Sequence, residues 1–158
     1  MIRIESFKVK ERPELAEIAF AIRREVFVVE QFVDPVLEYD EYEDTAIHYL
    51  LFLDEVPLAT ARWRETGKGI KLERFATLKE YRNKGIGNKI LDKVMEDVLS
   101  LKKPIYLHSQ VNAISFYERN GFVKEGEMFI EAEIKHYLMT FKSNIRYPEP
   151  VPSVVEGS

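Results

Sequence analysis

The sequence predicts a single domain of mixed α/β fold, and three observations support this prediction. The chain of 158 residues is 46% hydrophobic and 12% aromatic, which is enough to bury one compact core. Segments with strand-like alternation are interspersed with segments of helical periodicity. Turns containing glycine or charged residues separate many of these segments. We expect the domain to span residues 1–145 and the proline-rich residues 146–158 to form a flexible tail.

The first half of the chain predicts strands around one long helix. Residues 2–7 alternate apolar and polar side chains as a strand does, whereas residues 13–29 carry an apolar stripe at helical spacing and open on a proline. An acidic connection, residues 34–44, follows. Residues 46–65 then predict a hairpin, and two glycines turn the chain into a further strand at residues 70–78.

The alternation in the last of these strands breaks near its centre. Ile70 and Leu72 share one face, but the next large apolar residue is Phe75, so the phase shifts across Glu73 and Arg74. One extra residue in a strand, a β-bulge, produces this shift and frees backbone groups that a ligand can pair with. The alternative is a polar residue tolerated in a half-buried strand.

The second half predicts the clearest helix of the chain. Residues 86–101 place apolar side chains on one face, and Pro104 prevents continuation. A strand at residues 105–108 is followed by a short helix for which Asn112 is a plausible N-cap and Gly121 a terminator. Residues 122–129 and 135–141 predict the last two strands.

Composition excludes several classes of function. A net charge of -4 and a pI near 5.5 argue against nucleic-acid binding, which needs clustered cations. The absence of cysteine excludes disulfides and thiolate zinc sites, and three scattered histidines without ligand spacing argue against a metal. The chain has no long apolar run, so we expect no membrane span and a cytoplasmic location.

The stretch EYRNKGIGNKI, residues 80–90, places two glycines and several cations where a helix begins. It is not a Walker loop, and it lacks the third glycine of a dinucleotide fingerprint because Ile90 stands there. It fits a nest of backbone N–H groups at a helix N-terminus, which favours phosphate, with Arg82 and Lys84 adding charge. Gly85 and Gly87 would permit close approach of the ligand. An ordinary turn that starts a helix remains the alternative.

The order of elements and two sequence words together resemble the GNAT superfamily of acyl-CoA-dependent N-acyltransferases. The pyrophosphate loop of that family, R/Q-x-x-G-x-G/A, matches Arg82–Gly87, and its F-Y-x-x-x-G-F word matches Phe116–Phe122. The words IRREVFVVEQ, ARWRETGKGIKLER, SQVNAISFYERNGF and FIEAEIKHYLM are similar to the ElaA-like branch. The resemblance covers nearly the whole chain except the tail.

The resemblance implies a GNAT fold: a mostly antiparallel sheet of about seven strands, splayed at a β-bulge and flanked by about four helices. It also implies acetyl-CoA as the co-substrate, with no metal. The pantetheine arm would run beside residues of the bulged strand and be contacted across the splayed sheet, and the diphosphate would lie on the glycine loop. The implied cofactor-binding residues are Phe75, Ala76, Thr77, Arg82, Asn83, Lys84, Gly85, Ile86, Gly87, Asn88 and Asn112.

The implied chemistry is direct attack of a primary amine on the thioester. Glu73 is a candidate base because family members often carry an acidic base at this bulge; otherwise it is a solvated carboxylate or an ion-pair partner of a nearby arginine. Tyr117 matches the general acid of the family, whereas without the resemblance it would be a packing aromatic. His136 lies where ElaA-like sequences place a histidine and is a second candidate base, or simply a hydrogen-bonded side chain.

The acceptor remains open between a small polyamine-like or amino-sugar molecule and a protein amine. His48 and the acidic side chains of Asp40, Glu41, Glu43 and Asp44 are candidates for the rim of a pocket for a cationic amine, although such charge runs are usually solvated. The branch often has a glycine-isoleucine-proline-histidine turn, and here Glu133, Ile134 and Lys135 precede His136. A non-catalytic acyl-CoA sensor is the alternative function, and the final strands and tail are possible homodimer surfaces.

Overall fold

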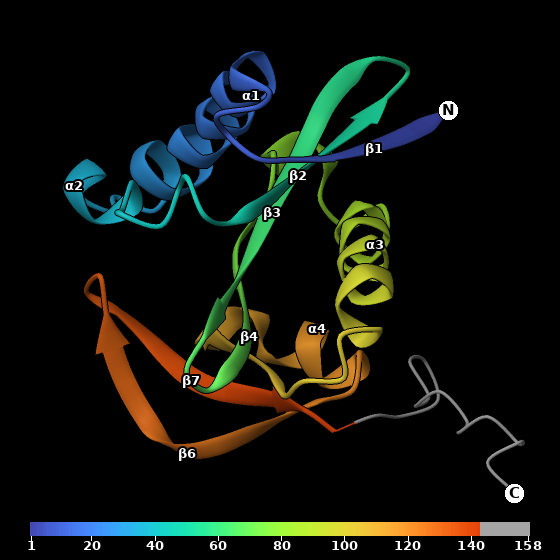
Figure 1. Cartoon of the computed structure of the whole chain (residues 1–158). Coiled ribbons are helices and arrows are strands. Elements are labelled where there is room, and N and C mark those ends of the chain that lie inside the picture. Colours follow the sequence, from blue (N-terminus) through green and yellow to red (C-terminus); the bar gives the residue numbers. More distant parts are fainter. Residues whose placement is uncertain (143–158) are drawn as a thin grey trace, which may run out of the picture.

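The computed structural model describes residues 1–142, so the predicted tail at 146–158 and the domain limit at 145 lie outside the described residues. Seven strands form one sheet in the order β1-β2-β3-β4-β5-β7-β6 (Figure 1). All neighbouring strands are antiparallel except β4 and β5, which are parallel. The strands are β1 (Ile2–Phe7), β2 (Ile47–Leu53), β3 (Val56–Thr66), β4 (Gly69–Thr77), β5 (Ile105–Gln110), β6 (Phe122–Glu131) and β7 (Ile134–Phe141).

Four α-helices accompany the sheet in the described part of the chain: α1 (Pro13–Arg23), α2 (Pro35–Glu38), α3 (Ile86–Leu99) and α4 (Ile114–Arg119). Helices α1 and α3 lie on opposite faces of the sheet (Figure 1). The apolar side chains of α3 join those of β2, β3, β4 and β5 in the larger core, while α1 packs with alternate residues of β2 in a smaller one. This is the mixed α/β architecture that the sequence predicts.

Three local predictions need correction. The helix predicted at 13–29 is α-helical only to Arg23 and continues as a π-helical segment, η1 (Arg24–Glu30). The acidic connection contains the short helix α2, whose N-cap is the Asp34 carboxylate, accepting a hydrogen bond from the Val36 N–H at 2.9 Å. Asn112 is not an N-cap, because a 3-10 turn, η3 (Val111–Ala113), precedes α4.

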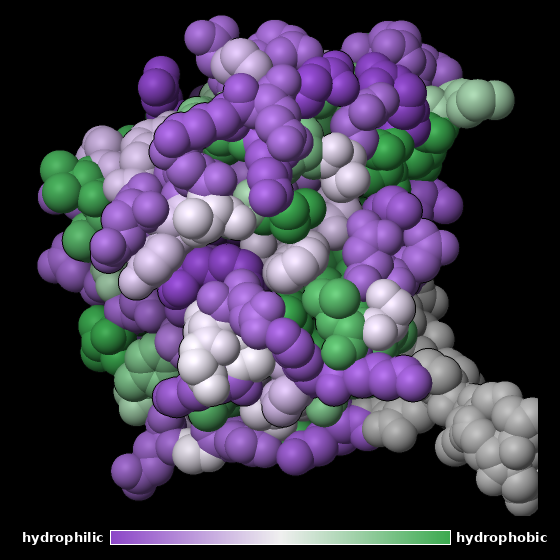
Figure 2. Space-filling view, in the orientation of Figure 1, coloured by the Kyte–Doolittle hydropathy of each residue, from purple (hydrophilic) through white to green (hydrophobic). Residues whose placement is uncertain are grey.

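The surface in Figure 2 is mostly hydrophilic, with separate apolar groups on its left edge at the height of α2. The side chains of Phe32, between η1 and α2, and of Val36 and Leu37, within α2, are exposed. None of the helices within residues 1–142 is both long and apolar enough to cross a bilayer.

Candidate active site

The site lies where β4 and β5 part. Their parallel pairing runs from Ile70 opposite Ile105 to Leu72 opposite Leu107 and then stops. Beyond this point β4 stays with β3, while β5 stays with β7, so the two halves of the sheet diverge (Figure 1). A cavity of about 570 Å³ occupies the gap, lined on one side by residues of β4 and on the other by residues of β5 and β7. The structure therefore has the predicted splayed sheet, and a cavity lies between the separated strands.

The β-bulge predicted in β4 is confirmed. Thr60 of β3 pairs with Ala76 and Arg62 pairs with Glu73, so two residues of β4 oppose one residue of β3. Arg74 takes up the extra length with a positive φ of 57°. Its guanidinium is held 2.9 Å from the Glu38 carboxylate, which ties the bulge to α2. The bulge changes which face the following side chains occupy, as the broken alternation indicated.

The glycine loop enters α3 through two left-handed residues, Asn83 at φ 63° and Gly85 at φ 82°. Gly85 is the N-cap of α3, and no side chain caps the helix. The first N–H groups of a helix lack partners within the helix, and left-handed residues turn successive N–H groups into a concave nest. Gly87 borders a second hollow of about 250 Å³, which shares Phe75–Thr77, Arg82 and Tyr117 with the larger cavity. The loop has the geometry expected of an anion site.

Arg82 forms an ion pair within the protein, whereas the sequence predicted that it adds positive charge to a phosphate site. Its guanidinium makes two hydrogen bonds with Glu30 of η1, at 2.5 and 2.7 Å, and its Nε donates to the Thr77 carbonyl at 3.0 Å. The hydrogen bond from Arg82 lowers the pKa of Glu30, so the pair is ionised at neutral pH. Arg82 therefore fastens the loop to η1 and to the end of β4, and much of its charge is already balanced by Glu30.

Tyr117 lies in α4 with its ring packed edge-on against Phe75, Phe116 and Phe122. It is 8% exposed, and it lines both hollows. Burial raises the pKa of its hydroxyl, so the phenol keeps its proton at neutral pH. Asn120, three residues later, donates to Asn88 of α3 at 3.1 Å, which fixes α4 against the helix that follows the glycine loop.

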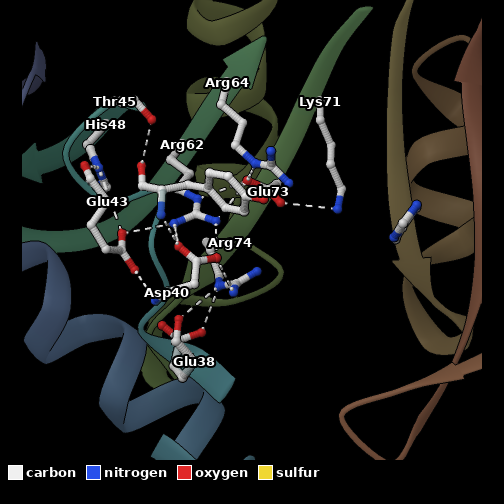
Figure 3. A network of polar contacts seen from close by, with 12 residues as sticks. Glu38, Asp40, Glu43, Thr45, His48, Arg62, Arg64, Lys71, Glu73 and Arg74 are labelled. Carbon is white, nitrogen blue, oxygen red and sulfur yellow. Dashed lines mark hydrogen bonds and ion pairs between the residues drawn. The ribbon is translucent and has the colours of Figure 1, made fainter. Parts of the chain in front are cut away.

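Glu73 is enclosed by cations (Figure 3). Its Oε1 accepts hydrogen bonds from Arg62 at 3.0 Å and Arg64 at 2.9 Å, while its Oε2 lies 3.2 Å from Lys71 Nζ. Burial alone would raise the pKa of Glu73, but the three cations outweigh burial and lower it. A carboxylate with a lowered pKa is a weaker proton acceptor. The ion-pair alternative from the sequence thus describes the contacts of Glu73 in this structure.

His136 lies on β7, on the opposite wall of the cavity, and is 6% exposed. Its Nδ1 is 2.7 Å from the Ile134 carbonyl, which only accepts, so Nδ1 carries the proton. In the neutral ring Nε2 then keeps a lone pair, and it lies 3.9 Å from Glu131. Glu131 is bonded to Nδ1 of His108 at 3.0 Å, and chiefly because of this bond its pKa is lowered to about 2.

Two of the four acidic side chains predicted to rim a pocket for a cationic amine, Asp40 and Glu43, are paired with arginines. Arg62 pairs with Asp40 at 2.6 Å and with Glu43 at 2.9 Å (Figure 3), and Arg23 also binds Glu43, at 2.7 Å. His48 is 1% exposed, and burial lowers the pKa of its ring. Of these groups only Asp40 lines the cavity. Asp40 and Glu43 instead belong to an ion network that connects α1, α2, β3 and β4, whereas Glu41 and Asp44 are exposed.

The cavity brings together most of the predicted site residues. Its lining contains Glu73, Tyr117, His136 and five of the predicted cofactor residues: Phe75, Ala76, Thr77, Arg82 and Asn112. The residues between Asn83 and Asn88 form the loop and the first turn of α3 instead. Sequence reasoning did not assign several polar lining residues to the site, although the alternation of β3, β4 and β5 places some of them on shared faces; among them are Arg64, Lys71, His108, Gln110 and Glu131.

A parted sheet, a bulged strand and a glycine nest at a helix N-terminus define an acyl-CoA-dependent acyltransferase. The acetyltransferase (GNAT) domain matches residues 11–143, and the chain belongs to this family. YjcF of Bacillus subtilis, described as an uncharacterized N-acetyltransferase, is 36% identical over 125 residues, covering 77% of this chain and 88% of YjcF.

Solved structures agree with this assignment. Escherichia coli ElaA has a TM-score of 0.80 and 25% identity, covering 90% of this chain and 100% of its own, which supports the ElaA-like branch. The PaiA N-acetyltransferase of Thermoplasma acidophilum, solved with coenzyme A, has a TM-score of 0.66 and 16% identity over 90% of this chain and 99% of its own.

Proposed function

We propose that this protein transfers an acetyl group from acetyl-CoA to a primary amine by direct attack of the amine on the thioester. The observation that carries the proposal is one continuous lining: the large cavity reaches from Arg82 and Thr77, beside the glycine loop, past Tyr117 to His136. A long co-substrate and a small acceptor can therefore meet in one space.

The chain has a fitting cradle for coenzyme A. Backbone N–H groups of residues 82–88 would hold the diphosphate, with Lys84 adding charge, and residues 75–77 with Asn112 would contact the pantetheine arm. The second hollow supports this arrangement because its wall at Gly87 carries no Cβ. The coenzyme A complex of the similarly folded PaiA enzyme adds support from a neighbour.

The acceptor must lose a proton before it attacks. An aliphatic ammonium with a pKa near 10.4 costs roughly 4.6 kcal/mol to neutralise at pH 7, at about 1.36 kcal/mol per unit. We assign the base to His136, because its Nε2 lone pair borders the cavity, and assign Glu73 to holding cations. The nitrogen forms its bond to the carbonyl carbon as the carbon–sulfur bond breaks, and a backbone N–H freed by the bulge would donate to the carbonyl oxygen.

Tyr117 would donate its proton to the departing sulfur. The burial of its hydroxyl keeps the phenol protonated until that charge develops, which suits a general acid. Within residues 1–142 the Tyr117 hydroxyl makes no hydrogen bond and burial alone raises its pKa, so the hydroxyl is available to a ligand.

A free-thiol release assay with acetyl-CoA and a panel of primary amines tests the proposal, with calorimetry on acetyl-CoA alone alongside. Amine-dependent thiol release supports the enzyme. Tight binding of acetyl-CoA without thiol release from any amine would instead support a sensor, and the absence of binding would remove both functions.

A further inference from the structure

Two cations face each other across β3 and β4 at the acceptor end of the cavity. Arg64 and Lys71 are directly paired in the antiparallel register, and both line the cavity. Their side chains are 17% and 14% exposed, so little water screens them. Like charges directly opposite one another destabilise a sheet unless an anion compensates them. The Arg64–Lys71 pair therefore requires a compensating anion.

Glu73 compensates the pair only in part (Figure 3). Its Oε1 is shared between Arg64 and Arg62, and the remaining contact is Oε2 with Lys71. Elsewhere in the network three arginines face three carboxylates, which leaves Glu73 as the one ion-pair partner that Arg64 and Lys71 share within residues 1–142. The balanced groups are Arg23, Arg62 and Arg74 with Glu38, Asp40 and Glu43.

Both cations keep donors for a ligand. Among the described residues Arg64 uses Nε for its hydrogen bond to Glu73, and its guanidinium lies 3.7 Å from the centre of the Tyr42 ring, which holds it in place. Lys71 Nζ has one ion-pair contact, with Glu73. A positioned guanidinium beside an ammonium suits a carboxylate, whose two oxygens can accept from both.

The opposite wall of the cavity carries a negatively charged side chain. Glu131 lines the same cavity, stays ionised at neutral pH because of its hydrogen bond from His108, and lies 3.9 Å from His136. Lys71 is one of the cations that lower the pKa of Glu131, so the two walls are close enough to interact. An ammonium group would be attracted to Glu131, beside the proposed base.

We propose that the acceptor is an amino acid or a similar compound that carries a carboxylate as well as the reacting amine. Arg64 and Lys71 bind the carboxylate, and Glu131 attracts the ammonium group next to His136. The acceptor bridges the two walls of the parted sheet. This inference rests on the proposed acetyl transfer and specifies its substrate class.

Steady-state thiol release with matched acceptors tests the inference, using lysine against cadaverine and phenylalanine against phenethylamine. The members of each pair differ by one carboxylate. The wild-type kcat/KM should favour the carboxylate-bearing member by about tenfold or more, the effect of a charge-assisted hydrogen bond. Lys71→Gln should remove most of this preference by raising the KM for the carboxylate-bearing members. The KM for acetyl-CoA should not change.

Two variants control the result. Lys71→Arg keeps the charge and should keep the preference, whereas Lys68→Gln removes an exposed cation from the nearby turn and should behave as wild type. Thiol release with equal or better use of the decarboxylated amines, or a preference that survives Lys71→Gln, overturns the inference. Absence of thiol release with every amine would instead refute the proposed function.

Discussion

Gly87→Ala distinguishes between the two interpretations of the glycine loop, a diphosphate-binding site and an ordinary turn that starts a helix. Gly87 is the second residue of α3, and a Cβ built there would lie 3.6 Å from the Phe116 ring, an ordinary van der Waals distance. Gly87 is not at a positive φ, unlike Gly85. The protein itself thus has room for alanine. Because alanine is a better helix former, the change should stabilise the fold by about 0.4–1 kcal/mol and raise Tm by roughly 1–4 °C.

The same methyl group should harm ligand binding. A diphosphate that accepts hydrogen bonds from the loop must bring its oxygens within about 3 Å of the backbone nitrogens, and a Cβ at the wall of the hollow obstructs that approach. We expect calorimetry to give a Kd for coenzyme A at least about tenfold weaker, equivalent to about 1.4 kcal/mol. Thermal unfolding measures the fold in parallel. A variant with raised Tm and unchanged Kd would refute the assignment of the loop to the diphosphate.

Three further predictions address the chemistry and the ion network. Tyr117→Phe should retain coenzyme A affinity in calorimetry and lose at least about 10²-fold in kcat, as expected for a general acid; equal turnover of the two proteins would remove that role. His136→Gln should lower kcat by about 10²-fold or more, as expected for the loss of a general base, whereas Glu73→Gln should lower kcat by less; the reverse pattern would return the base to Glu73. Arg62 outweighs burial and holds the pKa of Asp40 at about 2, below its ordinary 3.8, so this group stabilises the fold above about pH 4 and the contribution is lost as pH falls toward 2. Urea denaturation should find Asp40→Asn about 2 kcal/mol less stable at pH 7, with a difference that shrinks on acidification; a constant difference would show that the ion pair does not supply it.

Features that depend on local sequence were predictable. The bulge in β4 follows from the position of Phe75 after Ile70 and Leu72, because apolar side chains report which face of a strand is buried. The start of α3 follows from the glycines and the long apolar stripe after them. The seven strands and their mostly antiparallel arrangement also match the prediction.

Features that depend on contacts between distant segments were not predictable. The partner of Arg82 is Glu30, 52 residues earlier, and no local pattern pairs them. The opposition of Arg64 and Lys71 requires the register of β3 on β4. Glu131 reaches the cavity because the β6–β7 hairpin brings it beside His108 of β5. The N-cap predicted at Asn112 lies one residue before the observed N-cap of α4, Ala113, since helix boundaries are set by tertiary packing as well as by capping preference.

A crystal structure of the protein with coenzyme A tests the central claim most directly. We predict that the diphosphate oxygens accept hydrogen bonds from backbone N–H groups between Arg82 and Asn88. We also predict that the sulfur of coenzyme A lies between β4 and β5 within reach of the Tyr117 hydroxyl. A complex with the diphosphate bound elsewhere and the loop free of ligand would contradict the account.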